Sequence, residues 1–514
     1  MHEGRKREPR KRANGSSRIG RMVGGDGEAA TFAEQAEPPK RAFDAEGIME
    51  KLGLWWKSGA GGSFVLGAED KGWAIWPEQG VIDLMRNEYG IAIKAREDER
   101  LSEAKRVFLC TRQKRCLDEI FPALPGYGSG VHRLDSGERV LVKTQPTLIE
   151  PQAGEWETIK AVLYALLGAD QLLYFYSWCK IAHESLRDGE PGNWRPGHAM
   201  ILAGPRGAGK SLIQTKIITP LLGGREADPL KFLFGTDDFN GDCFSAEHLN
   251  LGEVPSSQKT VDRMALAETI KQIVATPLAR MRLMRTEPWS VHPFWRLTIS
   301  LNDDPDKLRS LPPITSDFGD KVLIFHTRKA KMPMRTTTLD ERKAFSTALS
   351  DEMPAFLAWL LDEWTIPEEL MTYPDGSDAS RFGFREYHSS LIKDGLFDET
   401  PAGELMMLID NAEFEGDGRR GLKLWDLPSD QGGVSGVEGK SWHGRAVMLE
   451  RLLLGQGGWQ CNLADQFKDF FKNNALTRAL QRLNEHPELG DGRRIAKSNT
   501  RHWKGWIVGR PVES

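Results

Sequence analysis

Eight consecutive residues near the middle of the 514-residue chain have the spacing of a phosphate-binding loop. They read GPRGAGKS and match the pattern GxxxxGK[ST], with an apolar strand before them at 198–203 and a helix-forming stretch after them at 212–217. Glycines let backbone N–H groups turn inward at a helix N-terminus, where the helix dipole attracts an anion. The pattern predicts an ATP site formed by Gly204, Pro205, Arg206, Gly207, Ala208, Gly209, Lys210 and Ser211.

Two side chains of this loop carry chemistry of their own. We expect the Lys210 ammonium to reach the β- and γ-phosphates and to act in catalysis, and the Ser211 hydroxyl to be the metal ligand that holds Mg²⁺. ATP and Mg²⁺ are therefore the expected cofactors. A chance glycine-rich turn is the alternative, and the strand before the loop and the helix after it argue against it.

Hydrolysis of ATP also needs a group that orients the attacking water, and Glu253 stands where one is expected. It follows the apolar stretch His248–Leu251, some 43 residues after Lys210. Gly252 occupies the preceding position, where an aspartate is usual, so the second protein contact to Mg²⁺ is left open between water and Asp237, Asp238 or Asp242. An ordinary glutamate at a strand end is the alternative interpretation.

The third apolar strand, 294–301, ends in Asn302. A polar side chain at the tip of a strand beside the phosphate loop can sense the γ-phosphate, so Asn302 is the third catalytic candidate. Before this strand we expect a helix over 261–274 and then a stretch where basic and apolar residues alternate. Its basic members, which suit a hairpin facing a phosphate backbone, are Arg280, Arg282 and Arg285. A solvated strand face is the alternative.

The order of these features resembles that of superfamily 3 helicases. The phosphate loop, Phe239-Asn240 about thirty residues on, Glu253, the Arg-bearing stretch and the strand ending in Asn302 follow one another within about residues 155–330. More narrowly, they look like the helicase domain of phage and plasmid primase-polymerases, the type found in the deep-sea vent phage polymerase. The resemblance implies an AAA+ core, a hexameric ring with ATP between subunits, and movement on single-stranded DNA.

The same resemblance implies a basic residue that reaches the ATP of the neighbouring subunit. In the family this trans-acting arginine usually follows the sensor in an Asp-Arg-Arg-Phe-like stretch, and the matching stretch here reads Gly319-Asp320-Lys321-Val322. A lysine supplies charge but lacks the planar fork that suits a phosphate. The candidates therefore remain Lys321, Arg309 and Arg328.

The order of strands and helices around these residues predicts an α/β fold class with an AAA+ P-loop NTPase core of three layers, αβα. We also expect an α+β and helical N-terminal accessory region and a C-terminal winged-helix-like domain. Along the chain we expect a disordered basic tail at 1–42, a small α+β accessory domain at 43–150, a helical layer at 151–197, the core at 198–330, a helical segment at 331–414 and a basic winged-helix-like domain at 415–514. Glycine-rich breaks are expected at 415–421 and 432–439.

The C-terminal region is basic, with thirteen Lys and Arg against six Asp and Glu from Lys440 to Arg510. A helix around 475–483 is followed by a stretch that predicts a two-stranded basic ribbon, which includes Arg493, Arg494, Trp503 and Trp506. A winged helix would have this order, with the helix offered to a DNA groove and the ribbon to the backbone. A winged helix that docks a protein is the alternative.

Charge and composition bound the remaining possibilities. The net charge is −4, but residues 1–22 hold eight Lys and Arg against two Glu, so the basic residues are concentrated at the two ends. The five scattered cysteines predict neither a disulfide framework nor a zinc site. We expect no secretory signal or membrane span, and the family resemblance implies the cytoplasm of a bacterial host cell.

These patterns favour an ATP-dependent DNA helicase of phage or plasmid replication that lacks its own primase domain. Its expected partners are single-stranded DNA or a replication fork, further copies of itself in a ring, and a separate primase or polymerase. One alternative is an AAA+ replication initiator or loader that melts DNA locally. Another is a nucleotide-gated DNA-binding protein with weak hydrolysis, which Gly252 and Lys321 would explain.

Overall fold

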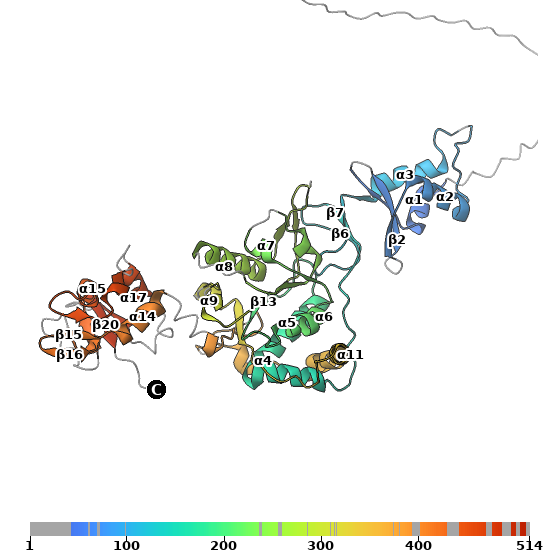
Figure 1. Cartoon of the computed structure of the whole chain (residues 1–514). Helices are drawn as coiled ribbons and strands as arrows, with labels where there is room; N and C mark the ends of the chain where they lie inside the picture. The colour runs from blue at the N-terminus through green and yellow to red at the C-terminus, as the bar shows by residue number, and fades with distance from the viewer. Residues whose placement is uncertain are drawn as a thin grey trace, which may run out of the picture.

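The structure is a computed structural model, and it describes residues 43–59, 62–68, 72–97, 99–235, 239–254, 260–284, 286–308, 310–312, 314, 316–373, 375–379, 381–392, 401–428, 441–468, 475–485, 495–499 and 504–509. The expected basic tail at 1–42 and the expected break at 432–439 lie outside these residues. Figure 1 shows an N-terminal part in blue, a central part from cyan to orange and a C-terminal part in red.

The N-terminal part is a small sheet covered by three helices. Strands β1 (Leu54–Lys57), β2 (Ser63–Ala68) and β3 (Gly72–Trp76) pair antiparallel, and β4 (Cys116–Leu117) joins β1 in parallel. Helices α1 (Ala45–Lys51), α2 (Glu78–Tyr89) and α3 (Glu103–Lys114) pack on one face of this sheet, because Leu54 and Phe64 share a cluster with Met49, Val81 and Val107.

The strands β5 (Glu119–Phe121), β6 (Gly130–Arg133) and β7 (Arg139–Val142) form a separate sheet in the order β5-β7-β6. Phe121 and Val140 belong to one of the two large hydrophobic clusters of the central part. Leu141 packs instead with Val65 and Leu117 of the N-terminal sheet. Within the 43–150 segment, the sheet at 119–142 thus packs with some residues against the central part and with others against the N-terminal sheet.

The central part is built on a five-stranded parallel sheet. Its order is β14 (Val322–His326), β8 (Ala199–Ala203), β13 (Arg296–Leu301), β10 (His248–Leu251) and β9 (Glu226–Ala227). Every neighbouring pair is parallel, so the carboxyl ends of all five strands lie along one edge. The phosphate loop leaves β8, and Asn302 leaves β13, which is the neighbour of β8. The two sequence segments therefore meet at the same edge of the sheet.

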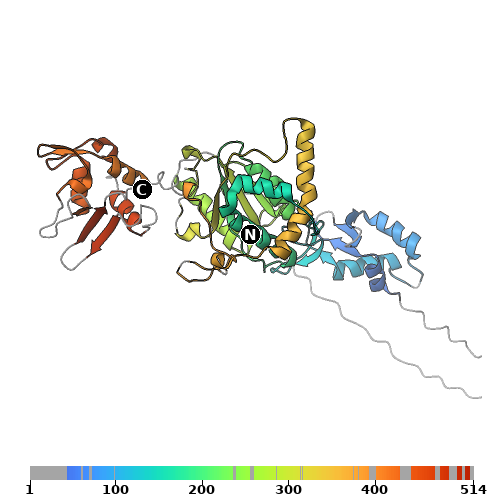
Figure 2. The same ribbon diagram turned by 90° about the horizontal axis from the view of Figure 1, so that it is seen from below.

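Helices cover both faces of this sheet. Met200 and Leu202 of β8 face a cluster formed with α4 (Glu157–Asp188), η1 (Gln214–Ile218) and α11 (Leu339–Ala358), which Figure 2 shows from the side of α4. Ile201 and Ala203 face the other cluster, which includes α7 (Leu230–Leu233) and α8 (Thr260–Ala275). This alternation confirms a mixed α/β fold around a parallel sheet.

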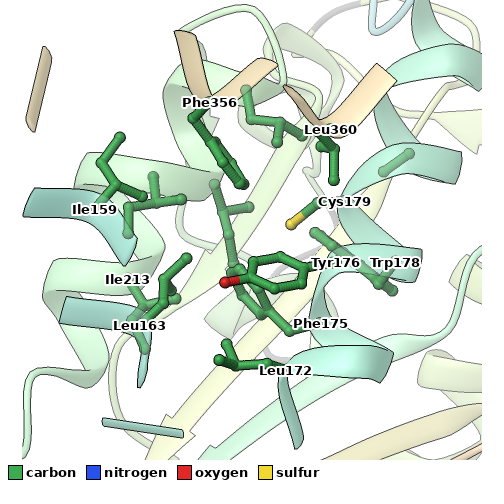
Figure 3. Packing of buried hydrophobic residues seen from close by; sticks show 14 of the residues in the cluster. Ile159, Leu163, Leu172, Phe175, Tyr176, Trp178, Cys179, Ile213, Phe356 and Leu360 are labelled. Carbon is green, nitrogen blue, oxygen red and sulfur yellow. The ribbon is translucent and has the colours of Figure 1, made fainter. Parts of the chain in front are cut away.

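Aromatic residues of α4 fill much of the space on the first face. Phe175, Tyr176 and Trp178 pack with Ile213 of α5 (Lys210–Ile213) and with Phe356 of α11, as Figure 3 shows. The helix α11 continues as η3 (Trp359–Glu363) and is followed by α12 (Glu368–Met371). Within the run 356–361, Phe356, Leu357 and Leu360 are fully buried.

Helix α4 changes direction at Gly168, whose backbone is non-helical with φ of 76°. The side chain of Gln171 holds the helix to β14, since it donates to the carbonyl oxygen of His326 at 2.9 Å and accepts from its N–H at 2.8 Å. The backbone N–H of Arg328 donates to the carbonyl oxygen of Leu166 at 2.8 Å. These bonds fix the helix turn that packs against the phosphate loop.

The C-terminal part has its own hydrophobic cluster and two three-stranded sheets, in the orders β16-β15-β18 and β17-β20-β19. The strands are β15 (Phe414–Gly416), β16 (Arg419–Leu422), β17 (Ser441–Gly444), β18 (Gln460–Cys461), β19 (Ile495–Asn499) and β20 (Lys504–Gly509). The helices are α14 (Pro401–Asn411), η4 (Leu424–Asp426), α15 (Ala446–Leu453), α16 (Ala464–Phe467) and α17 (Ala475–Glu485).

Two details of this part differ from simple expectation. The stretch 415–421 is a hairpin rather than a break, because Asp417 and Gly418 both have positive φ and form a tight turn between β15 and β16. Helix α14, at the end of the segment 331–414, contributes Leu405 and Ile409 to the C-terminal cluster. Among the described residues, no helix is long and apolar enough to cross a membrane.

Candidate nucleotide-binding site

The predicted phosphate loop connects β8 directly to α5. Gly209 is the N-cap of α5 and has φ of 76°, and a Cβ at this position would stand 2.6 Å from Cδ1 of Leu166. A Cβ at Gly204 would stand 2.2 Å from the carbonyl oxygen of Thr327, which follows β14. Two of the loop's glycines are therefore required by close packing against α4 and against the end of β14.

The ammonium group of Lys210 lies inside the loop. It donates to the carbonyl oxygens of Gly204 at 2.6 Å and Pro205 at 3.0 Å, and to Oδ1 of Asn302 at 3.3 Å. Burial lowers the pKa of Lys210, while the carboxylates of Asp303 and Asp304 oppose that shift. These carbonyl and amide oxygens are neutral, and they hold the ammonium group beside the space that the loop encloses.

The Lys210–Asn302 bond joins residues that are 92 positions apart in the chain. The parallel pairing of β8 with β13 brings them together, because Ala203 lies beside Leu301 in the register. Asn302 is the first residue after β13, as the strand pattern predicted. Its amide therefore lies where it can contact both the lysine and a group bound in the loop.

Glu253 follows β10 by two residues and lies on the same edge of the sheet. Its side chain is 66% exposed, and a carboxylate oxygen is 2.9 Å from the ammonium group of Lys307 in α9 (Pro305–Leu308). The hydrogen bond and charge of Lys307 lower the pKa of Glu253, and Arg206 of the loop adds to this effect. The carboxylate of Glu253 is therefore ionised and forms an ion pair with Lys307.

These groups line a single pocket of about 690 Å³. The volume falls within the range of small-molecule sites, about 300–1,000 Å³. It brings together the loop, the end of β10 and the end of β13, which the sequence separates widely. Its lining residues are Arg206, Gly207, Ala208, Gly209, Lys210, Ser211, Leu212, Gly252, Glu253, Ser300, Leu301 and Asn302.

Gly252 contributes no side chain to this pocket, and a Cβ built there meets no other atom within 4 Å. Its carbonyl oxygen accepts a hydrogen bond of 2.6 Å from Ser300. Of the residues that might replace the missing aspartate, Asp242 is exposed on η2 (Gly241–Ser245), and it does not line the pocket. Asp237 and Asp238 lie outside the described residues.

A buried polar network supports the floor of the site. His248 of β10 contacts Thr219 Oγ1 at 2.7 Å and Thr298 Oγ1 at 2.8 Å, and Gln214 of η1 donates to Thr298 at 2.9 Å. Burial lowers the pKa of His248 to about 3, so the ring is neutral. These contacts tie together the strand before Glu253, the strand before Asn302 and the helical stretch after the loop.

The predicted basic stretch is one strand of a hairpin. β11 (Ala279–Met281) pairs antiparallel with β12 (Trp289–Val291), and Met281 is buried while Arg280 and Arg282 are exposed. Asn240 clamps this strand. Its amide group donates to the carbonyl oxygen of Arg280 at 2.9 Å and accepts from the N–H of Arg282 at 2.7 Å. Arg285 lies outside the described residues.

The three candidates for a trans-acting residue differ in their surroundings. The Lys321 ammonium is bonded within its own chain, to both carboxylate oxygens of Asp320 at 2.7 and 2.9 Å and to the carbonyl oxygen of Asp317 at 2.7 Å. The Arg328 side chain is 56% exposed and lies 4.0 Å from Asp170. Arg309 lies outside the described residues.

The predicted C-terminal ribbon is present as the antiparallel pair β19 and β20, which follows α17. Trp506 is buried in the C-terminal cluster and is only 4% exposed, so its ring packs in the core instead of offering a surface to a nucleic acid base. Lys497 lies over this ring at 5.5 Å. Arg493, Arg494 and Trp503 lie outside the described residues.

Sequence patterns alone missed Lys307 and Thr327. Lys307 pairs with Glu253, and the only available signal was a basic residue five positions after Asn302. Thr327 donates its backbone N–H to the carbonyl oxygen of Ala203 at 2.7 Å and its hydroxyl to the same oxygen at 3.1 Å, which anchors the start of the loop. A threonine after a short apolar strand gave no distinctive pattern.

Comparisons with known proteins show limited similarity. A family of unknown function (DUF5906) matches residues 202–313, which include the loop, Glu253 and Asn302. None of the curated proteins compared with the chain matches it. An apo structure of the NrS-1 C-terminal region is 12% identical, with a TM-score of 0.46 over 72% of this chain and 78% of that one. A JCV helicase structure is 13% identical, with a TM-score of 0.23 over 37% of this chain and 54% of that one.

Proposed function

We propose that this protein binds and hydrolyses ATP and uses the energy to act on nucleic acid. The observation that carries the proposal is the pocket in which Lys210, Asn302 and Glu253 line the same space as the phosphate loop. An ammonium group, a sensing amide and a carboxylate around an anion-binding turn are the groups that phosphoryl transfer to water requires.

Each of these residues has a defined task in the proposed reaction. The loop N–H groups and Lys210 bind the phosphates, Asn302 contacts the γ-phosphate, and Glu253 accepts a proton from the attacking water. Ser211 is exposed at the start of α5 and offers its hydroxyl to Mg²⁺, which would neutralise charge on the phosphates. Because Gly252 offers no carboxylate, the second contact to Mg²⁺ would come from water or from a carboxylate elsewhere in the chain.

Two of these groups must change partners before turnover. Lys210 has to exchange the carbonyl oxygens of Gly204 and Pro205 for phosphate oxygens, which carry far more negative charge. Glu253 has to leave Lys307 in order to face a water molecule. A carboxylate that remains paired with an ammonium is a weak base, so this ion pair holds the site in a resting arrangement.

In this proposal the protein moves along single-stranded DNA and contacts it through the β11–β12 hairpin. Arg280 in β11 and Arg282 just after it are exposed, Met281 between them is buried, and Asn240 fixes the backbone at both arginines. In the chain, the hairpin lies between the strand before Glu253 and the strand before Asn302, since it follows α8 and leads into the start of β13. In this proposal the protein is a superfamily 3 helicase of phage or plasmid type, assembled as an AAA+ ring.

The second candidate is a nucleotide-gated DNA-binding protein with weak hydrolysis. Two specific observations favour it: Gly252 has no carboxylate to offer to the metal, and Lys321 is bonded to Asp320 in its own chain. Such a protein would bind ATP and DNA but release little phosphate. Turnover measurements therefore separate the two candidates.

The test is ATP hydrolysis by the full chain, with and without single-stranded DNA, beside Glu253→Gln and Lys210→Ala. A helicase predicts turnover that DNA stimulates and that both substitutions abolish. Nucleotide and DNA binding without turnover would instead select the gated binder. Turnover that survives Lys210→Ala would refute the assignment of the loop, and a strand-displacement assay would then be uninformative.

A further inference from the structure

A second pocket, of about 320 Å³, lies at the opposite edge of the central sheet from the phosphate loop. Arg296, which begins β13, lines it, whereas Asn302 follows the other end of the same strand. Six residues of parallel strand span about 20 Å, so the two pockets are separate sites. The remaining walls come from the end of α8, the segment 192–196 and Arg381.

Arg296 is a buried cation that has no acidic partner in the part of the chain that the structure describes. It is only 3% exposed, and its guanidinium donates to the carbonyl oxygens of Trp295 and Arg195, each at 2.9 Å. Its Nε has no hydrogen-bond partner among the described residues. Burial lowers the pKa of Arg296 to about 9 with no opposing carboxylate. A buried charge of this kind is costly unless a counter-charge is supplied.

The other residues of the pocket add to this excess of positive charge. Arg195 and Arg381 also line it and are exposed, and none of the described residues that line it is acidic. Trp194 is partly exposed and supplies aromatic surface, and Thr276 supplies a hydroxyl, whereas Phe294 is fully buried with its ring 4.5 Å from the Arg296 guanidinium. The pocket therefore combines three guanidinium groups with the partly exposed ring of Trp194.

We propose that this pocket binds a phosphate group of a nucleotide, either a free nucleotide or one within a nucleic acid strand. Guanidinium groups match the planar, bidentate geometry of phosphate oxygens, and the partly exposed ring of Trp194 can accept a base by stacking. The volume lies at the lower end of the range for small-molecule sites, which suits a mononucleotide. This inference does not depend on the proposed ATPase activity.

The pocket also lies at the base of the β11–β12 hairpin. Its wall includes Thr276 and Pro277, just before β11, and Pro293 and Phe294, just after β12. A ligand there would contact both connections of the hairpin that carries Arg280 and Arg282. A strand bound along the hairpin could therefore place one of its phosphates beside Arg296, whereas a free nucleotide would occupy the pocket alone.

The experiment uses the full chain carrying Lys210→Ala, which weakens the phosphate-loop site. Binding of thymidine monophosphate and of a 15-nucleotide oligothymidine is measured by titration calorimetry. Arg381→Gln and Arg195→Gln remove exposed charges from the pocket, and Arg296→Met removes the buried one. We expect each to weaken binding by about tenfold or more, because each removes a charge-assisted contact. Arg342→Gln, an exposed arginine of α11 outside the pocket, is the matched control.

The two probes distinguish the source of the phosphate. Loss of mononucleotide binding in the pocket variants identifies a free-nucleotide site, and loss confined to the oligonucleotide identifies a strand contact. If neither probe binds, or if the pocket variants bind as well as Arg342→Gln does, the proposal is wrong. Arg381→Gln and Arg195→Gln keep the test decisive if Arg296→Met does not fold, and a thermal unfolding curve is recorded for every variant.

Discussion

Gly204→Ala tests whether the start of the phosphate loop is fixed by its contact with β14. The added Cβ would lie 2.2 Å from the carbonyl oxygen and 2.3 Å from Oγ1 of Thr327, well inside the 3.0 Å that real Cβ contacts respect. The hydroxyl can rotate away, but the carbonyl belongs to backbone bonded to Ala203. The loop must therefore move by about 0.8 Å to relieve this contact.

A displacement of this size has a predictable kinetic effect. Misplacing catalytic groups by about 1 Å can cost about a hundredfold in rate, so we expect kcat/KM for ATP to fall by about that factor. The assay is steady-state phosphate release, with thermal unfolding to confirm that the variant is folded. Gly128→Ala is the control, since its Cβ would meet only one atom, at 3.9 Å, and Gly128 is exposed outside the pocket. Unchanged kcat/KM in folded Gly204→Ala would refute the argument.

Three further predictions follow from the site. Lys307→Gln removes the group that lowers the pKa of Glu253, so the acid limb of the pH profile of kcat/KM should move to higher pH, and an unmoved limb would exclude Glu253 as the base. Gly252→Asp places a carboxylate in open space beside Glu253, so the Mg²⁺ concentration for half-maximal turnover should fall, and an unchanged concentration would show that position 252 does not reach the metal. Replacing Arg280 and Arg282 by Gln should reduce the slope of log affinity against log salt by about 1.4 for single-stranded DNA, whereas an unaltered slope would place the contact elsewhere.

The parts of the proposed nucleotide site could be located from the sequence where they obey local rules. The loop is contiguous, so its spacing alone predicts it, and the structure places it between β8 and α5. Glu253 and Asn302 could be found because each follows an apolar stretch, and the carboxyl ends of parallel strands meet along one edge of a sheet. These predictions required no knowledge of side-chain contacts.

The remaining features depend on contacts that no spacing rule encodes. The pairing of Lys307 with Glu253 depends on how α9 packs beside β10, and that of Lys321 with Asp320 depends on a local rotamer. Trp506 lies in β20, where alternate residues face the core. The sequence does not indicate which face of this strand packs against the rest of the C-terminal part, so the burial of Trp506 could not be predicted. The charge of Arg296 becomes unusual only once the fold buries it.

The charged groups of the proposed reaction all have partners in their own chain. Lys210 is bonded to loop carbonyls, Glu253 to Lys307, and Lys321 to Asp320. Phosphate oxygens compete directly for Lys210, so nucleotide binding alone can supply that exchange. The phosphates can also compete with Glu253 for the ammonium group of Lys307, because both carry negative charge. Since the side chain of Glu253 is 66% exposed, its release requires only the loss of this ion pair and a rotation of the side chain. In the proposed reaction, nucleotide binding can therefore supply both exchanges.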